Sequence, residues 1–443
     1  MTSFDAAIFS THSSIKSGEL DIAGVLATQL AADYGTPLFV VDESDFKARA
    51  KGWNNALNSA FGVSDGMVYY AAKSFVCKEI ARWVSETGIG LDVCTGGEMA
   101  VAIAAGFPMD RVELHGNNKS EKEIRTAIEV GIGTIVVDSF HEIERVSRIA
   151  AELGKVQKVY IRVTPGVEAH THEFISTAHE DVKFGFSIAS GAAWTAIQEI
   201  RKSSSLNLAG LHSHIGSQIF ASEGFAAAAV KVIAVLAKYR DAFGSELPEL
   251  DLGGGYGIAY IPGEITLDPT VVMSELAAVV KRECAAAKIA VPKISIEPGR
   301  AIVGPTTTTL YTVGTTKDVA LDNGATRRYV AVDGGMSDNI RPALYGAEYL
   351  AIIANRSSTA TQINCRVVGK HCESGDIIIR EIQLAQDLVP GDLLAIPATG
   401  AYGRSMASNY NHLTRPAVIA VKDGKARLIV RRETETDLLA LEL

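Results

Sequence analysis

Short apolar segments alternate with longer amphipathic or alanine-rich segments through residues 67–300, and this repeat constrains the fold more than any other feature. The apolar segments have the length and composition of buried strands, and the segments between them have the periodicity of helices. The expected strands are Met67–Lys73, Ile89–Val93, Val112–His115, Thr134–Val137, Lys158–Val163, Leu208–His214, Glu249–Leu252 and Lys293–Ile296. Eight strands that alternate with helices predict a TIM-like (β/α)8 barrel. An open doubly wound sheet is the alternative, but no GxGxxG turn follows the first strand.

The 443 residues are too many for one ordinary core, so we expect two domains. The helices expected include Ile22–Tyr34, Ser44–Ala60, Glu121–Val130, His141–Leu153, Ala192–Arg201, Phe225–Phe243 and Val271–Ala287. After Arg300 the helices become few, and alternating segments between Gly and Asp turns predict a second, β-rich domain, a barrel or a sandwich. A strand at Thr36–Val41 is expected to join it. We therefore predict a barrel domain at 43–304 and a β-rich domain made of 1–42 and 305–443.

The composition is that of a soluble globular protein, with 47% apolar and 21% charged residues. The net charge is −9 and no basic cluster stands out, which argues against a surface for nucleic acid or for an anionic membrane. No apolar run approaches the roughly 20 residues that a membrane span needs, and the N-terminus lacks the pattern of a signal peptide. Five scattered cysteines without a CxxC motif lead us to expect a cytoplasmic protein without disulfides or structural zinc.

Lys73 stands at the end of the first expected strand, in the segment MVYYAAKSF. Lysine is rarely buried because its ammonium group is costly to desolvate. Burial that lowers the lysine pKa would free the amine for a Schiff base with a carbonyl partner. From this segment alone, a lysine that simply points into water is the more common case.

Polar residues stand at the ends of all eight expected strands, where the chemistry of such a barrel is found. They are Lys73, Asp92, His115 with Asn117, Asp138, Arg162, His214 with Ser217, Gly253–Gly255, and Glu297 with Arg300. Because loops are polar in general, each group needs its own argument. The three glycines would leave backbone N–H groups accessible to a phosphate, to which Ser217 could also donate. A tight turn explains the glycines equally well.

Glu297 ends an apolar strand, so its pKa should rise unless the carboxylate faces a cation. A protonated pyridine nitrogen is such a cation, and a salt bridge to Arg300 or another basic residue is the alternative. His212 and His214 share one face of their strand. A metal pair would need a third ligand, which no spacing indicates, so we expect no metal. The imidazole of His214 could stack on a planar cofactor, whereas for His212 we expect a core residue.

Three segments of the β-rich region could also carry chemistry. RPALY at 341–345 and GAYGR at 400–404 pair arginine with tyrosine, a combination that suits a carboxylate. CESGD at 372–376 places a thiol beside two carboxylates. Each of these segments would be an ordinary loop on its own.

Taken together, these motifs resemble the fold-type III pyridoxal-phosphate-dependent decarboxylases, and most closely the branch that acts on diaminopimelate. The resemblance covers nearly all of the chain, from TPLFVVD to the TRPA segment at 414–417. Its most specific motifs are HGNNKS at 115–120, PGVEAHTHE at 165–173 and CESGD, whereas the glycine loop and EPGR at 297–300 are shared with related decarboxylases. The resemblance implies a carboxy-lyase that converts meso-2,6-diaminopimelate into L-lysine and CO2, the last step of lysine biosynthesis.

The resemblance also implies roles for individual residues. The cofactor pyridoxal 5'-phosphate would be held by Lys73 and Asp92, by His214 against the ring, by Glu297 at the ring nitrogen, and, around the phosphate, by Ser217, Gly253, Gly254, Gly255, Gly299, Arg300 and Tyr402. The substrate would be bound by Arg300, Arg341, Tyr345, Glu373 and Tyr402. Catalysis would fall to Lys73, His214, Glu297 and Cys372. Cys372 is the candidate proton donor and would enter the active site of the partner subunit in a homodimer.

Four alternatives stay open. A sibling decarboxylase that acts on ornithine, lysine or arginine would leave Arg341 and Tyr345 without a distal carboxylate to bind. A non-catalytic regulator with the same fold is disfavoured because Lys73, the glycine loop and Glu297 are retained. CESGD and EPGR argue against an alanine racemase, and the lack of a ligand cluster argues against a metal-dependent barrel enzyme.

Overall fold

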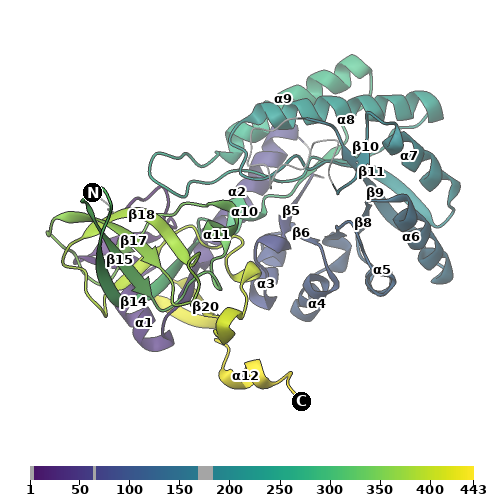
Figure 1. The fold of residues 1–443 in the computed structure, drawn as a ribbon. Coiled ribbons are helices and arrows are strands. Elements are labelled where there is room, and N and C mark those ends of the chain that lie inside the picture. Colours follow the sequence, from purple (N-terminus) through teal and green to yellow (C-terminus); the bar gives the residue numbers. More distant parts are fainter. Residues whose placement is uncertain (1–3, 63–65, 168–182) are drawn as a thin grey trace. The chain divides into compact units, whose positions relative to one another are not determined.

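The computed structural model describes residues 4–62, 66–167 and 183–443. The chain divides into two compact units, drawn in Figure 1. The unit that we call the β unit consists of Met1–Ala48, Ile258–Thr266 and Ala301–Leu443, and the barrel unit consists of Arg49–Gly257 and Leu267–Arg300. The domain boundaries expected at residues 43 and 304 stay a prediction.

Eight parallel strands form the centre of the barrel unit and pair in chain order around a closed ring. They are β5 (Met67–Ala71), β6 (Gly90–Val93), β7 (Val112–Leu114), β8 (Thr134–Val137), β9 (Gln157–Thr164), β11 (Leu206–His212), β12 (Glu249–Asp251) and β13 (Lys293–Ile296). The ring closes because β13 pairs with β5, with Ile296 opposite Val68. A short extra strand, β10 (Phe186–Ser187), adds to β9. The predicted (β/α)8 barrel is therefore confirmed, and each expected strand matches one strand of the ring.

Helices surround the strand ring of the barrel unit (Figure 1). They are α2 (Glu43–Phe61), which begins in the β unit, α3 (Lys78–Glu86), α4 (Gly96–Ala105), α5 (Glu121–Glu129), α6 (Phe140–Glu152), α7 (Ala192–Lys202), α8 (Ser222–Phe243) and α9 (Pro269–Ala287). Helix α5 shows why they form: Ser120 and Glu123 make a capping box at its start, and Ile124, Ala127 and Ile128 form its buried face. None of the helices in the described ranges is long and apolar enough to cross a membrane.

The β unit is built on a mixed sheet with the strand order β18–β17–β15–β14–β4–β20–β21. Its strands are β4 (Leu38–Asp42), β14 (Thr307–Ala320), β15 (Thr326–Val332), β17 (Gln362–Val368), β18 (Ile377–Ala385), β20 (Ala417–Lys422) and β21 (Lys425–Val430), with β16 (Ile352–Ile353) and β19 (Leu393–Ile396) beside them. Strand β4 pairs antiparallel with β14 and parallel with β20. The expectation that an N-terminal strand joins the β-rich domain is therefore confirmed. The short helices α10 (Gly299–Val303), α11 (Arg341–Tyr345) and α12 (Glu435–Leu439) complete this part of the chain.

The helix expected at Ile22–Tyr34 is wrong in its first half. Helix α1 covers Ala27–Tyr34, and a small antiparallel sheet precedes it, made of β1 (Ser13–Lys16), β2 (Glu19–Ile22) and β3 (Val25–Leu26). Ala23 and Gly24, with φ values of +49° and +90°, turn the chain between β2 and β3. This left-handed turn is incompatible with a helix that starts at Ile22.

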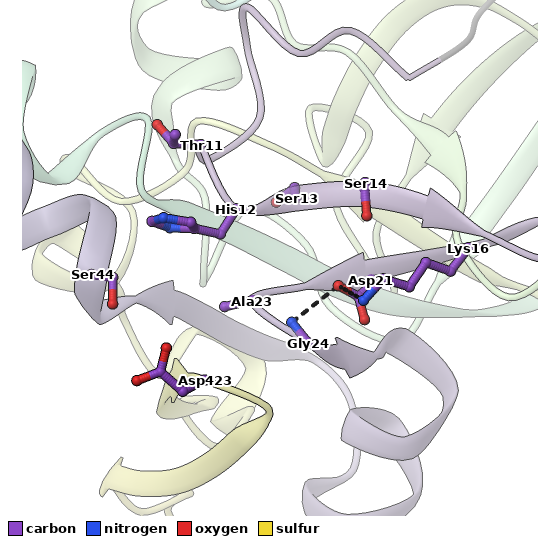
Figure 2. Close-up of a pocket in the computed structure, with 10 residues that line it drawn as sticks. All are labelled: Thr11, His12, Ser13, Ser14, Lys16, Asp21, Ala23, Gly24, Ser44 and Asp423. Carbon is purple, nitrogen blue, oxygen red and sulfur yellow. Dashed lines mark hydrogen bonds and ion pairs between the residues drawn. The ribbon is translucent and has the colours of Figure 1, made fainter.

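A pocket beside this small sheet is lined by residues that include Thr11, His12, Lys16, Asp21 and Asp423 (Figure 2). Lys16 and His12 each have an acidic partner within the β unit. Nζ of Lys16 lies 2.9 Å from Oδ1 of Asp21, and Nδ1 of His12 lies 2.9 Å from Oδ2 of the buried Asp42. None of the residues expected at the active site lines this pocket, so it is not the site that the sequence predicts.

Candidate active site

The barrel unit places Lys73 beside a buried carboxyl group. Strand β5 ends at Ala71, and one 3-10 turn over Ala72–Ser74 carries Lys73 just beyond the carboxyl end of the strand. Nζ of Lys73 lies 3.7 Å from Oδ2 of Asp92, and the Lys73 side chain is 38% exposed. Burial raises the pKa of the Asp92 carboxyl to about 7, although the charge of Lys73 opposes this shift. The amine is therefore tied to the barrel and still open to a small molecule.

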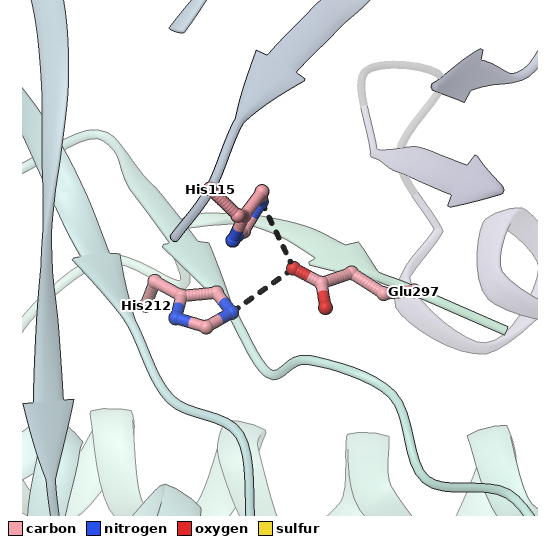
Figure 3. Close-up of side chains that lie close together, drawn as sticks. All are labelled: His115, His212 and Glu297. Carbon is pink, nitrogen blue, oxygen red and sulfur yellow. Dashed lines mark hydrogen bonds and ion pairs between the residues drawn. The ribbon is translucent and has the colours of Figure 1, made fainter. Parts of the chain in front are cut away.

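Glu297 lies at the centre of a second buried group, in which two imidazoles share one of its oxygens (Figure 3). Nε2 of His212 lies 2.9 Å from Oε1 of Glu297, and Nε2 of His115 lies 3.3 Å from the same oxygen. Burial alone would raise the pKa of Glu297, but the two histidines hold it well below its usual range. Burial also lowers the pKa of both histidines. The group thus holds one carboxylate and two neutral imidazoles.

His212 was expected to be a satisfied core residue; it is buried and hydrogen-bonded to Glu297, so it also belongs to this cluster. The pair considered as metal ligands was His212 with His214, whereas the structure brings His212 together with His115. His115, His212 and Glu297 offer ligand atoms within 4.8 Å of one another, which is close enough for a metal ion. The hydrogen bond between His212 and Glu297 explains the same geometry without an ion.

Two further carboxyl groups stand next to Glu297, and the sequence analysis missed them. Oxygens of Glu113, Asp251 and Glu297 lie within 4.8 Å of one another, and all three side chains are buried. Burial, together with the neighbouring carboxylates, raises the pKa of Glu113 and of Asp251 well above the usual range. Both therefore hold a proton more readily than a solvent-exposed carboxyl group does. For Glu113, an acidic residue between the apolar residues of the strand VEL is the signal that could have revealed it, whereas Asp251 ends the strand ELD, which carries no such signal.

The glycine loop after β12 is shaped by close contacts. A Cβ atom on Gly254 would lie 2.3 Å from the carbonyl oxygen of Glu297, so the loop lies directly against the end of β13. The expectation of accessible N–H groups is wrong for two of the three glycines. Gly253 donates to Oδ1 of Asp251 at 2.6 Å, and Gly254 donates to Nδ1 of His214 at 3.1 Å. The second bond fixes the neutral His214 ring at the loop, because burial lowers the pKa of His214 well below its usual range.

Ser217 and Arg300 form a group of donors in the same unit. Nη2 of Arg300 donates to Oγ of Ser217 at 2.9 Å, and the Arg300 side chain is largely buried. Gly299 lies against Ala71, since an added Cβ would come within 2.7 Å of the Ala71 Cβ. A guanidinium and a hydroxyl already held together suit an anion such as phosphate.

The other strand-end residues make structural contacts or lie at the surface. Nε of Arg162 lies 4.0 Å from Oδ1 of Asp138, and its guanidinium lies 4.3 Å from the ring centre of Phe184. Asn117 is exposed. Residues 168–173 of the PGVEAHTHE motif lie outside the described residues, so the expectation for this motif stays a prediction.

In the β unit, Arg341 is buried and contacts two tyrosines that the sequence analysis did not name. Its Nη1 donates to the hydroxyl of Tyr349, and its guanidinium carbon lies 4.6 Å from the ring centre of Tyr260. Tyr345, which was expected to act with Arg341, is half-buried at the end of α11. Tyr402 is half-buried and has a φ of +62°, a strained value for a residue with a side chain.

The CESGD turn presents its thiol and its first carboxylate to solvent. Asp376 is buried and accepts hydrogen bonds from the backbone N–H groups of Met336 and His371, at 2.6 and 2.9 Å. These bonds fix the base of the turn. Cys372 and Glu373 are exposed at its tip, so each can meet a partner from outside the β unit.

Comparison with known proteins identifies the family. Residues 43–304 match the model for the pyridoxal binding domain of the pyridoxal-dependent decarboxylases. The chain is 55% identical to the diaminopimelate decarboxylase of Mycobacterium tuberculosis over 430 residues, which cover 96% of this chain and 95% of that protein. The chain belongs to the diaminopimelate decarboxylase family. The crystal structure of diaminopimelate decarboxylase from M. jannaschii superposes on this decarboxylase with a TM-score of 0.88 and 32% identity, over 98% of both chains.

Family membership confirms the predicted fold, the predicted class of carboxy-lyase and the predicted cofactor, pyridoxal phosphate. The barrel unit of this decarboxylase fits that cofactor at each end. Lys73 supplies an amine for the aldehyde, and Ser217 with Arg300 supplies donors for the phosphate. Glu297 supplies a carboxylate whose closest partners are neutral imidazoles, so its charge remains for a cation such as a protonated ring nitrogen.

Proposed function

We propose that this chain removes CO2 from the D-configured carbon of meso-2,6-diaminopimelate and releases L-lysine. The product keeps the L centre, so the D centre must lose its carboxylate. The observation that carries the proposal is that the barrel unit holds three groups suited to the cofactor. They are the Lys73 amine, the Glu297 carboxylate and the paired donors of Arg300 and Ser217. Support for the substrate comes from relatives such as the Bacillus subtilis diaminopimelate decarboxylase, 47% identical over 96% of this chain, and from a M. jannaschii diaminopimelate decarboxylase solved with L-lysine.

When bound, pyridoxal phosphate supplies an electron sink for the electron pair that the departing carboxylate leaves behind. Lys73 binds its aldehyde, and Asp92 holds the lysine nitrogen near the strand end. Glu297 carries the charge that keeps the ring nitrogen protonated, and His214 lies against the ring. The phosphate is assigned to Ser217, Gly255, Arg300 and Tyr402. Gly253, Gly254 and Gly299 contribute through the close approach of the chain, since the N–H groups of all three are bonded within the barrel unit.

The far end of the substrate carries a second carboxylate and a second amino group. We assign the carboxylate to Arg341 and Tyr345, with Arg300, and the amino group to Glu373. Ornithine, lysine and arginine lack the distal carboxylate, so they would leave the buried Arg341 guanidinium unmatched. A site built around such a group rejects substrates that cannot pair with it.

Cys372 is the proposed donor of the proton that replaces the carboxylate, and we propose that it comes from the partner subunit of a homodimer. Its exposure at the tip of the CESGD turn is what such a role needs. The five cysteines are free, which supports the proposal that the enzyme works in the reducing cytoplasm.

The test is a CO2-release assay on purified protein with added pyridoxal phosphate. Meso-diaminopimelate, L-lysine, L-ornithine and L-arginine are offered in parallel. Turnover of diaminopimelate alone supports the reaction and the distal-carboxylate pocket. Turnover of ornithine or arginine would instead overturn the roles of Arg341 and Tyr345, while leaving the cofactor chemistry in place.

A further inference from the structure

We propose that His212, assisted by His115, is a positioning residue that keeps Glu297 ionised and leaves its second oxygen for the ring nitrogen of the cofactor. The inference rests on the proposed function, since it concerns how that cofactor is held. The two imidazoles reach Glu297 from different strands of the ring, His212 from the end of β11 and His115 from the residue after β7.

Both imidazoles use the same carboxylate oxygen. His212 and His115 approach Oε1 of Glu297 at 2.9 and 3.3 Å. The other oxygen, Oε2, points away from both rings (Figure 3) and accepts no hydrogen bond from the described residues. A carboxylate held in this way has one occupied oxygen and one that remains available to a further donor.

The surroundings decide which ring nitrogen carries the proton. A neutral imidazole has one N–H group and one bare nitrogen. Nδ1 of His212 is buried and has no partner among the described residues, so the N–H group is at Nε2 and donates to Glu297. Nε2 of His115 faces carboxyl oxygens of Glu297, Glu113 and Asp92 at 3.3, 3.5 and 3.8 Å. This nitrogen makes no hydrogen bond within the described residues, so the contact of His115 with Glu297 is electrostatic.

The cluster then decides which of three close carboxyl groups is charged. Glu113, Asp251 and Glu297 repel one another when ionised, so one charge is far easier to keep than three. Asp251 accepts one backbone N–H bond, and neither oxygen of Glu113 has a hydrogen-bond partner within the described ranges. Glu297 receives both imidazoles. Without His212, the charge of Glu297 loses its strongest local donor, and a proton on Glu297 would no longer favour a proton on the ring nitrogen.

The test reads the ring nitrogen directly, without substrate. The enzyme is loaded with pyridoxal phosphate labelled with 15N at the ring, and the 15N chemical shift is measured by NMR across a pH series. Wild type is compared with His212→Leu and with His212→Gln, whose amide can replace the Nε2–H donor. Ser213→Ala is the matched control, because its buried hydroxyl has no partner among the described residues. Metal content of the purified apoprotein is measured alongside.

We expect a protonated ring nitrogen in wild type, His212→Gln and Ser213→Ala, and loss of that proton in His212→Leu. The kcat of His212→Leu should fall roughly 10- to 100-fold, the factor of one hydrogen bond to a charged group, with a smaller change in KM. A ring nitrogen that stays protonated in His212→Leu, or that is unprotonated in wild type, would overturn the proposal. So would one equivalent of a metal that His212→Leu fails to bind.

Two further results keep the test decisive. If His212→Leu does not fold, His115→Leu takes its place and should shift the ring nitrogen in the same direction by a smaller amount; no shift would contradict the proposal. Because the shift is read without substrate, a wild-type enzyme that fails to turn over diaminopimelate would sink the proposed reaction and leave this inference standing.

Discussion

The Glu297 cluster and the CESGD turn hold ionisable groups in opposite settings. In the barrel unit, Glu297, His115 and His212 are buried, and Nε2 of His212 and of His115 lie 2.9 and 3.3 Å from Oε1 of Glu297. In the β unit, Cys372 and Glu373 are exposed at the tip of a turn that is fixed at its base. The strand register of the barrel therefore prearranges the first group. The second group needs something beyond its own unit, a substrate or a partner subunit, before its environment is complete.

We expect the largest loss of activity from a substitution in the barrel unit. Lys73→Ala removes the amine proposed to hold the cofactor, so CO2 release from diaminopimelate should fall by more than about a thousandfold. The exposed Lys78 offers a matched control, and Lys78→Ala should keep wild-type turnover. Turnover in Lys73→Ala within tenfold of wild type would show that the barrel cluster is not organised around this amine.

Cys372→Ala tests the exposed side. Loss of a positioned proton donor should lower kcat about a hundredfold. Pyridoxal phosphate binding, followed by cofactor titration, should stay unchanged because Cys372 is not among the residues proposed to hold the cofactor. Cys77→Ala is the matched thiol control. Near wild-type turnover in Cys372→Ala would remove the thiol from the mechanism.

One experiment tests whether Lys73 of the barrel unit and Cys372 of the CESGD turn act in the same active site across two subunits. Lys73→Ala and Cys372→Ala proteins, each strongly impaired on its own, are mixed, dissociated and reassociated. If Cys372 serves the active site of the partner subunit, half of the dimers are mixed and each has one intact site. About a quarter of the wild-type activity should then return. No recovery, in a mixture that sizing and mass spectrometry show to contain mixed dimers, would place both residues in the active site of one subunit.

A smaller effect is expected for substrate recognition at the turn. Glu373→Gln keeps the shape of the side chain and removes its charge, so kcat/KM for diaminopimelate should fall about tenfold, as for one charged hydrogen bond. Cofactor affinity should not change. Glu381→Gln, an exposed glutamate on β18, is the control. Unchanged kinetics in Glu373→Gln would mean that the distal amino group is recognised elsewhere.

The sequence predicts the barrel and the strand-end residues because both follow from periodicity along the chain. It does not predict contacts across strands. Glu113 lies within β7 and Asp251 at the end of β12, and their approach to Glu297 depends on how the ring closes. The same holds for the hydrogen bond of His212 to Glu297 and for that between Arg341 and Tyr349. The N–H groups of Gly253 and Gly254 are bonded to Asp251 and His214. These are tertiary contacts, which no local sequence pattern contains.

The smallest expected effect is a change in the stability of the apoprotein with pH. It tests whether the buried Asp92 is protonated in the folded chain. The pKa of Asp92 is about 7 in the folded chain, above its ordinary value of 3.8. Between about pH 4 and pH 7 the folded state therefore keeps a proton that the unfolded state has lost, so this group's contribution to the free energy of unfolding falls as the pH rises. In Asp92→Asn that contribution is absent. The free energy of unfolding of Asp92→Asn, relative to wild type, should rise by about 2.5 kcal/mol between pH 5 and pH 8 in urea unfolding. A constant difference between the two proteins across this range would mean that Asp92 is ionised throughout, with Lys73 as a full counter-ion.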